Sequence, residues 1–218
     1  MERILPEEVK KDVETILTKL SGSVRMMLFV DENCDTCVLN ERLYMEVVEA
    51  SPKLQLSIHD LGEERGLAAK YGVDVAPTLV VTDEVGEKAV LFTGTPHGHE
   101  FSSLLDGMLA MSGSGTKLTG EIVKKIEAAG RTVTVQVFVS PTCPYCPMAL
   151  KAAFPLAAAT PKVRVQMIQA TEFPEWAARK RVMGVPKLVV DDRIEIEGAV
   201  PTAKLVEAIA SIRPAAKA

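Results

Sequence analysis

The sequence predicts an α/β protein built from two similar units, each a mixed central sheet flanked by helices. One spacing occurs twice, because Cys34 and Cys143 lie 109 positions apart and so do Pro77 and Pro186. The residues around the two prolines also match, with VAPTLVV at 75–81 and GVPKLVV at 184–190. A fixed offset between matching segments indicates that one structural unit is repeated.

The composition is that of a globular protein with a substantial core. Of the 218 residues, 47% are hydrophobic and 25% are charged, and the formal net charge is −4. This balance argues against disorder, and the lack of a Lys/Arg-rich run argues against nucleic acid as a partner. The first residues lack the pattern of a secretory signal, and no apolar run approaches the ~20 residues of a membrane span. We therefore expect a cytoplasmic protein with no membrane partner.

Hydrophobic periodicity predicts the same order of elements in each unit: a leading helix, then strand, helix, strand, helix, strand, strand, helix. In the first unit these are a helix over 7–20, a strand over 24–30, a helix after the Cys34 pair, a strand over 54–58, a helix over 63–71, strands over 78–81 and 89–92, and a helix over 100–111. In the second they cover 120–129, 133–139, 149–158, 163–168, 175–182, 187–190, 193–196 and 202–212. The stretch at 112–116 suits a short flexible linker or a helix stop, so we expect units over 1–112 and 113–218.

All four cysteines belong to two motifs, Cys34-Asp35-Thr36-Cys37 and Cys143-Pro144-Tyr145-Cys146. So few cysteines, paired in this way, indicate redox or metal chemistry rather than a disulfide-stapled secreted scaffold. Disulfide exchange requires a thiolate, which the N-terminus of a helix stabilises. Cys34 and Cys143 are therefore the predicted nucleophiles. Cys37 and Cys146, held close in the first helical turn, are predicted to resolve the mixed disulfide with a substrate.

A strand, a Cys-x-x-Cys that opens a helix, and a proline about forty residues later before an apolar hairpin together resemble the thioredoxin fold. Two such units resemble the glutaredoxin-like protein disulfide oxidoreductases of thermophilic archaea and bacteria, over nearly the whole chain. The resemblance implies an enzyme that reduces, forms or isomerises protein disulfides through two redox-active disulfides and no other cofactor. Its partners would be protein disulfides or dithiols and a thioredoxin-reductase-like electron donor.

The resemblance also assigns substrate-binding residues. The cis-proline of the fold maps onto Pro77 and Pro186, so Ala76 and Val185 would present their backbone to an extended substrate. Tyr145, between the two cysteines of the second motif, is expected to contact the substrate, and Cys-Pro-Tyr-Cys is the tetrapeptide typical of glutaredoxins.

Two departures favour glutaredoxin over thioredoxin as the comparison. Leu28 and Val137 stand where thioredoxins keep a buried acid, and Asn33 and Thr142 stand where they usually carry tryptophan. Glutathione dependence would require cations for the carboxylates of the tripeptide. Near the second motif the candidates are Lys151 and Lys187.

The two sites are expected to differ in reactivity. Asp31, Glu32 and Asp35 surround the first motif with negative charge, which disfavours a thiolate, whereas the residues around the second motif are nearly uncharged. We therefore predict that Cys143 is the more acidic thiol. The second site would face protein substrates, while the first would relay electrons or assist isomerisation.

Other interpretations remain open. Two Cys-x-x-Cys pairs can hold zinc or an iron–sulfur cluster, although the 105 residues between them far exceed the ~15–20 of zinc ribbons. The disulfides could be purely structural, the chain could be an inactive scaffold, or it could be an electron-relay domain for a peroxidase system. His97-Gly98-His99 suits a solvated loop better than a metal site, and Trp176 is expected to pack in the interior.

Overall fold

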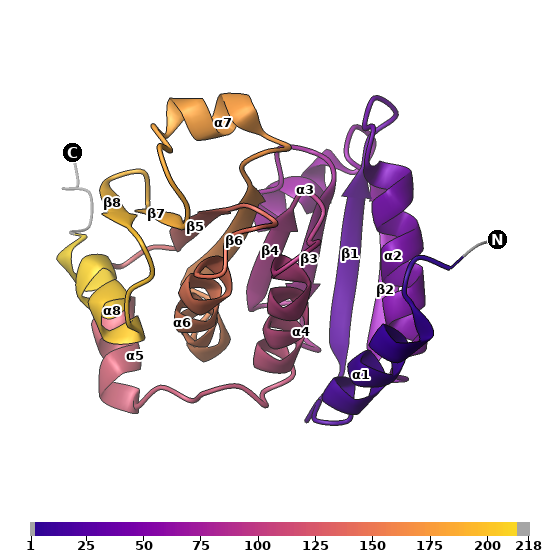
Figure 1. The fold of residues 1–218 in the computed structure, drawn as a ribbon. Helices are drawn as coiled ribbons and strands as arrows, with labels where there is room; N and C mark the ends of the chain where they lie inside the picture. The colour runs from indigo at the N-terminus through magenta and orange to yellow at the C-terminus, as the bar shows by residue number, and fades with distance from the viewer. Residues whose placement is uncertain (1–2, 213–218) are drawn as a thin grey trace.

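The computed structural model describes residues 3–212 and has one eight-stranded mixed sheet with helices on both faces (Figure 1). In chain order the elements are α1 (Glu7–Leu17), β1 (Val24–Val30), α2 (Cys37–Glu49), β2 (Leu54–Asp60), α3 (Arg65–Tyr71), β3 (Thr78–Thr82), β4 (Ala89–Thr93), α4 (Glu100–Met111), α5 (Gly120–Glu127), β5 (Val133–Val139), α6 (Cys146–Ala159), β6 (Val163–Gln169), α7 (Pro174–Arg179), β7 (Lys187–Val190), β8 (Ile194–Glu197) and α8 (Thr202–Ser211). The predicted order of elements is confirmed in both repeats.

Each repeat contributes four strands with the same pairing. In the first, β1 pairs parallel with β2 and antiparallel with β3, and β3 pairs antiparallel with β4. In the second, β5 pairs parallel with β6 and antiparallel with β7, and β7 pairs antiparallel with β8. The two sets join because β4 pairs parallel with β6, which gives the order β2-β1-β3-β4-β6-β5-β7-β8. The sequence predicts the two sets of strands but not their union in one sheet.

The alternation of side chains along the strands divides the core between the two faces of the sheet. Along β1, Val24, Met26 and Leu28 contribute to the large core cluster, whereas Met27 and Phe29 contribute to a smaller one on the opposite face. Residues of α1, α2, α4, α5, α6 and α8 cover the large cluster. The opposite face is covered by α3 in the first repeat and by α7 in the second (Figure 1), where Trp176 packs as expected.

Several helices differ in extent from the prediction. Helix α1 ends at Leu17 rather than at residue 20, and α7 ends at Arg179 rather than at 182. Arg181 has φ 51°, a left-handed conformation that cannot continue a right-handed helix. Helix α2 begins at Cys37, and α6 likewise begins at the second cysteine of its motif. The motifs therefore form the turn that leads into each helix, not its first turn.

The segment between the repeats is tied to the first one. Helix α4 ends at Met111, in agreement with a helix stop. The hydroxyl of Ser114 donates to the carbonyl of Lys19 at 2.6 Å and accepts the Ser21 N–H at 2.8 Å.

Among residues 3–212, no helix combines the length and apolar character that crossing a membrane requires.

Candidate redox sites

Both Cys-x-x-Cys pairs are disulfides with the same local geometry. The Cα atoms are 5.4 Å apart in the Cys34–Cys37 pair and 5.5 Å apart in the Cys143–Cys146 pair. In each motif the N–H of the second cysteine donates to the carbonyl of the first, at 3.3 and 3.4 Å. Each pair lies at the N-terminus of a helix that follows the central strand of its repeat, β1 or β5. The unpaired N–H groups there favour a thiolate at the first cysteine.

Within each pair the second cysteine is the more deeply buried. Cys37 is 4% exposed and Cys34 is partly exposed. Cys146 is 0% exposed and Cys143 is 6% exposed. The first cysteine of each pair is therefore the more accessible one, while the division into nucleophile and resolving thiol stays a prediction.

The two predicted proline turns lie beside these sites. The Ala76–Pro77 and Val185–Pro186 peptide bonds are both cis, as the sequence predicts. The carbonyl oxygen of Val185 lies 3.6 Å from the Sγ of Cys143. The backbone of Val185 is thus positioned next to the sulfur at which exchange would take place.

The rim of the second disulfide is apolar and exposed. Tyr145 lies within the motif, Met148 lies just beyond it, and Met183 lies two residues before Val185; their exposed fractions are 64%, 59% and 91%. At the equivalent positions of the first repeat, Thr36 replaces the tyrosine and Asp74 replaces Met183, while Leu39, 44% exposed, takes the place of Met148. Protein partners bind preferentially to exposed Tyr and Met, so this rim is suited to protein contact.

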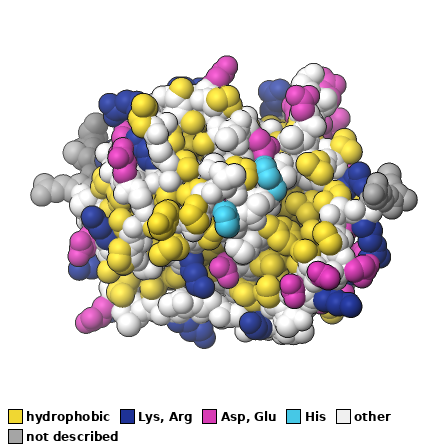
Figure 2. All heavy atoms as spheres, in the orientation of Figure 1, with side chains coloured by type: hydrophobic (Ala, Val, Ile, Leu, Met, Phe, Trp, Pro, Cys, Tyr) yellow, Lys and Arg dark blue, Asp and Glu magenta, His cyan; other side chains and the backbone are white. Residues whose placement is uncertain are grey.

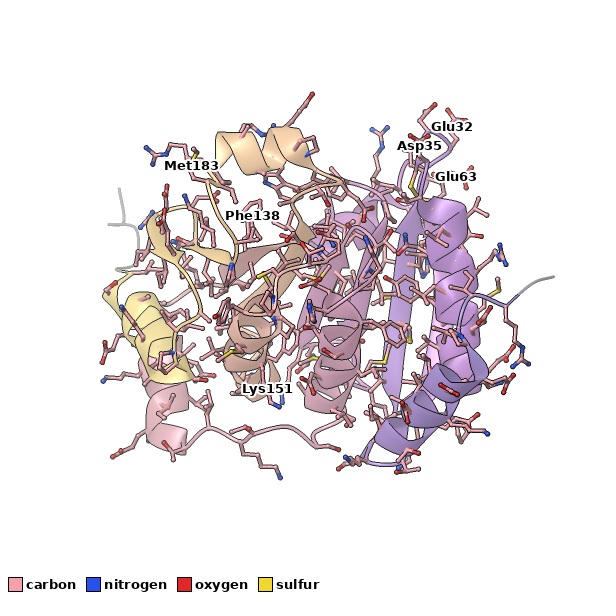
Figure 3. All side chains as sticks on the ribbon, in the orientation of Figure 1. Glu32, Asp35, Glu63, Phe138, Lys151 and Met183 are labelled. Atoms are coloured by element: carbon pink, nitrogen blue, oxygen red, sulfur yellow. A yellow bond between two sulfur atoms is a disulfide. The ribbon has the colours of Figure 1, made fainter. Side chains whose placement is uncertain are left out.

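The rim of the first disulfide is acidic. Figure 3 shows Glu32, Asp35 and Glu63 at the end of the molecule where the first motif leads into α2. In the same orientation Figure 2 shows acidic side chains gathered at the upper right. The sequence predicts acidic surroundings for the first motif and nearly uncharged surroundings for the second, and Glu63 adds a further acidic side chain near the first (Figure 3).

Two comparisons with known proteins agree with this geometry. The family described as "Thioredoxin domain" matches residues 133–211. The alkyl hydroperoxide reductase component AhpF of Staphylococcus aureus (strain NCTC 8325 / PS 47) is 26% identical over 188 residues, which are 86% of this chain and 34% of that protein. The AhpF protein of Escherichia coli (strain K12) is 23% identical over 206 residues, 94% of this chain and 37% of that protein. The chain spans about a third of the length of these curated relatives.

Solved structures give the same fold over nearly the whole chain. The alkyl hydroperoxide reductase component AhpF of Enterococcus faecalis (V583), as a C503A mutant, superposes with a TM-score of 0.85 at 27% identity and covers 94% of this chain and 99% of that one. A protein disulfide oxidoreductase from Aeropyrum pernix K1 superposes with a TM-score of 0.80 at 23% identity over 99% of both chains. The chain therefore has a tandem thioredoxin fold, and the Cys-x-x-Cys disulfide in each repeat supports thiol–disulfide exchange.

One loop contacts the segments that flank both redox motifs. The N–H of His99, after β4, donates to the carbonyl of Pro141 just before the second motif, at 3.1 Å. Gly98 has φ +64°, and a Cβ there would collide with the same carbonyl. At the other end of the loop, the hydroxyl of Thr95 accepts a hydrogen bond at 2.9 Å from Asn40 Nδ2 of α2.

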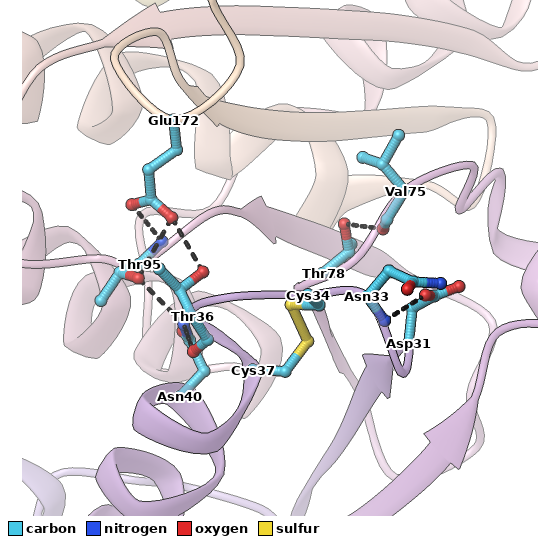
Figure 4. The surroundings of a disulfide bond; sticks show 10 residues. All are labelled: Asp31, Asn33, Cys34, Thr36, Cys37, Asn40, Val75, Thr78, Thr95 and Glu172. Carbon is cyan, nitrogen blue, oxygen red and sulfur yellow. Dashed lines mark hydrogen bonds between the residues drawn. A yellow bond between two sulfur atoms is a disulfide. The ribbon is translucent and has the colours of Figure 1, made fainter.

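A carboxylate from the second repeat reaches the first motif, as Figure 4 shows. Glu172 lies between β6 and α7, and its Oε2 accepts the hydroxyls of Thr36 and Thr95, each at 3.2 Å. Its Oε1 accepts the Thr95 N–H at 2.8 Å. No pattern in the sequence separates this glutamate from a solvated one, because the contact joins residues 136 positions apart.

The suggestion that Lys187 binds a glutathione carboxylate is corrected. Its side chain is 2% exposed, and Nζ donates to the carbonyls of Lys180 and Arg181 at 2.8 and 3.0 Å and to Glu195 at 2.8 Å. All three ammonium donors are thus used internally. Lys151 is exposed on α6 and remains a candidate.

The described residues contain no cluster that suggests a metal site. Within residues 3–212, no group of three or more His, Cys, Asp or Glu side chains is placed to hold a metal ion. His97 and His99 are exposed in the loop before α4, as the sequence predicts, and His97 Nδ1 lies 3.0 Å from the carbonyl oxygen of Thr95.

Glu100 is a buried carboxyl group that the sequence does not reveal, since a glutamate at the start of a helix ordinarily faces solvent. It begins α4 and is 0% exposed, and within the described chain neither carboxylate oxygen has a hydrogen-bond partner. Burial raises its pKa to about 7. The folded state therefore holds a proton that the unfolded chain releases near pH 4.5.

This shift predicts how stability depends on pH. Because the pKa of Glu100 is raised on folding, its contribution to the free energy of unfolding is complete below pH 4.5 and is lost as the pH rises to about 7. At 1.36 kcal/mol per pKa unit, the loss amounts to roughly 3 kcal/mol. We expect Glu100→Gln to remove most of this loss. Urea unfolding at pH 5 and pH 8 measures it, with Glu121→Gln on the exposed face of α5 as control. An equal loss in Glu100→Gln and wild type would contradict the assignment.

Proposed function

We propose that this oxidoreductase carries electron pairs from a thioredoxin-reductase-like flavoprotein to a disulfide in a protein partner, and that a thiol peroxidase is that partner. Cys143 is the nucleophile toward the partner, Cys146 resolves the mixed disulfide, and Cys34 and Cys37 form the relay couple. The two units, 1–112 and 113–218, each supply one couple. We place this exchange in the cytoplasm, where thiols are kept reduced.

The chemistry requires two exchange steps at the second site. The Cys143 thiolate attacks the partner disulfide, which forms a mixed disulfide and releases one partner thiolate. The Cys146 thiol then loses its proton and attacks Cys143 Sγ, which forms the intramolecular disulfide and releases the second partner thiolate. One dithiol is oxidised and one disulfide is reduced, so electrons and protons balance.

The observation that carries the proposal is the contrast between the two rims. The second disulfide is bordered by exposed apolar side chains at positions 145, 148 and 183, and the backbone of Val185 lies beside Cys143. This combination suits an extended segment of a protein partner, with Val185 and Pro186 offering backbone contacts and Tyr145 a flat apolar surface. In the first repeat Ala76 and Pro77 take the equivalent place beside an acidic rim.

The relatives support the class of partner. The curated proteins similar to this chain are components of alkyl hydroperoxide reductases, so a peroxidase disulfide is a chemically consistent electron acceptor. The runner-up function is general reduction or isomerisation of protein disulfides, which the same two steps would perform.

A trapping experiment tests the proposal. The fully reduced Cys146→Ser variant, mixed with an oxidised two-cysteine thiol peroxidase, is expected to accumulate a mixed disulfide at Cys143 because no resolving thiol remains. The matched variant Cys37→Ser is expected to accumulate none under the same conditions. Mass spectrometry of non-reduced peptides identifies the linked cysteines. Trapping through Cys34 would reverse the assigned roles, and trapping of insulin but not of the peroxidase would favour the general oxidoreductase.

A further inference from the structure

We propose that Glu172, supplied by the second repeat, is a positioning residue for the first redox motif and holds the reactivity of Cys34 down. The inference rests on the proposed use of Cys34 and Cys37 as an exchanging couple. It adds that this couple is completed by a side chain from the other half of the chain.

The first observation is the set of bonds between the repeats. Glu172 binds Thr36, the residue immediately before Cys37, and it binds both the N–H and the hydroxyl of Thr95 (Figure 4). Asn40 closes the network from the other side, because its Nδ2 donates to the Thr36 carbonyl and to the Thr95 hydroxyl, each at 2.9 Å. The carboxylate therefore contacts the turn of the first motif and the loop after β4 at the same time.

The second observation is the close approach of side chains of the second repeat to the backbone of Gly94. Gly94 has φ +90°, and a Cβ there would lie 2.6 Å from Cβ of Gln169 and 3.3 Å from Cδ of Glu172. Only glycine fits this conformation without strain and without collision. The segment that carries Glu172 is thus packed directly against the first repeat and held there, because the carbonyl of Thr95 also accepts a bond at 3.4 Å from Gln169 Nε2.

The charge of Glu172 reaches into the first repeat. Tyr44 lies one turn beyond Asn40 on α2 and is fully buried. Burial raises the pKa of its hydroxyl, and the negative charge of Glu172 raises it further. The same charge acts on an anion that forms at the start of α2.

The expected effect follows from the sign of the charge. A carboxylate near a thiol disfavours the thiolate and raises the thiol pKa. Asp31, Glu32 and Asp35 surround the same motif. Glu32 and Asp35 are exposed, so solvent screens their charge, whereas Asp31 is partly buried and accepts the Asn33 N–H at 2.9 Å. Glu172 is partly buried and is held in place by three hydrogen bonds, so its charge is screened less. Its removal should raise the Cys34 thiolate fraction more than removal of the exposed Glu32 or Asp35 would.

The experiment measures that fraction in the full chain. Reduced protein is alkylated with iodoacetamide at several pH values, and the rate at each cysteine is read by mass spectrometry of its peptide. Glu172→Gln keeps an acceptor oxygen and removes the charge, so we expect Cys34 to react about three to ten times faster at pH 7. Cys143 serves as the internal reference, and its rate is expected to stay the same.

Two further variants separate this role from a merely structural one. Glu175→Gln removes an equal charge three residues away on the exposed side of α7, and we expect less than a twofold change at Cys34. In a Thr36→Val background the effect of Glu172→Gln is expected to fall by at least half, because the hydrogen bond that joins the carboxylate to the motif is absent and only the two bonds to Thr95 remain. Retained unfolding cooperativity in urea verifies that each variant is folded.

The possible outcomes are distinguishable. An unchanged Cys34 rate in Glu172→Gln, or equal changes at Cys34 and Cys143, would overturn the inference, as would an equal effect of Glu175→Gln. If Glu172→Gln does not fold, the Thr36→Val variant alone decides, since a Cys34 alkylation profile identical to wild type would overturn the inference. A Cys34–Cys37 pair that cannot be reversibly reduced would instead overturn the proposed function.

Discussion

Replacing Cys143 with serine is expected to lower the rate of protein-disulfide reduction by roughly three orders of magnitude or more, because the nucleophile itself is lost. Cys146 is fully buried and cannot take its place at the surface. The first couple does not compensate, because its rim is acidic and its thiol is predicted to be the weaker acid. The rate of insulin or peroxidase reduction, with dithiothreitol as electron source, measures the loss.

Cys34→Ser is the matched control for this experiment. With dithiothreitol it is expected to keep most of the activity, because a small dithiol can reduce the second couple directly. With a flavoprotein donor it is expected to lose activity, because the relay couple is absent. Full activity of Cys143→Ser with dithiothreitol would contradict the assignment of the second site to the partner.

Replacing Phe92 with alanine is expected to destabilise the whole chain by about 3–5 kcal/mol, the usual cost of removing a buried aromatic ring. Phe92 lies on β4, the strand that pairs with β6, and is 0% exposed. Its ring centroid is 6.0 Å from that of Phe154 on α6, and Gly107 of α4 approaches it so closely that a Cβ there would lie 2.8 Å from the ring. The ring thus fills the junction between the repeats.

Urea unfolding measures this loss as a lower midpoint. Val85→Ala is the control, because Val85 is exposed and its truncation is expected to change the free energy of unfolding by less than about 0.5 kcal/mol. A loss near 1 kcal/mol in Phe92→Ala would show that the junction adjusts to the missing ring. Two separate unfolding transitions in wild type would contradict a shared core.

Local pattern explains how much of the fold the sequence predicts. The strand over 133–139 alternates apolar and polar residues in part, and β5 covers the same residues. Helix ends such as that of α7 are missed, because Arg181 gives no sequence signal of its left-handed conformation. The pairing of β4 with β6 is also missed, because each strand is apolar in its own right and the choice of partner is made by tertiary packing.

The residues of the sites also divide into those that local sequence pattern predicts and those whose environment depends on tertiary packing. The cysteines and prolines follow from two spacings that coincide, because redox chemistry requires the two sulfurs to be close in the chain. Glu172 and Glu100 do not follow, since their environment comes from distant segments. Lys187 is the opposite case, because a lysine beside a predicted site appears available in the sequence and is buried with all its donors used.

The most direct test of the central claim is a redox titration of the purified chain. The protein is equilibrated in thiol buffers of graded potential, quenched by alkylation and weighed by mass spectrometry, alone and as the Cys34→Ser and Cys143→Ser variants. Two reversible two-electron couples, one of which is lost in each variant, are the expected result for a relay through two dithiol sites. Four thiols that resist alkylation until a chelator is added, or disulfides that no buffer reduces in the folded chain, would contradict it.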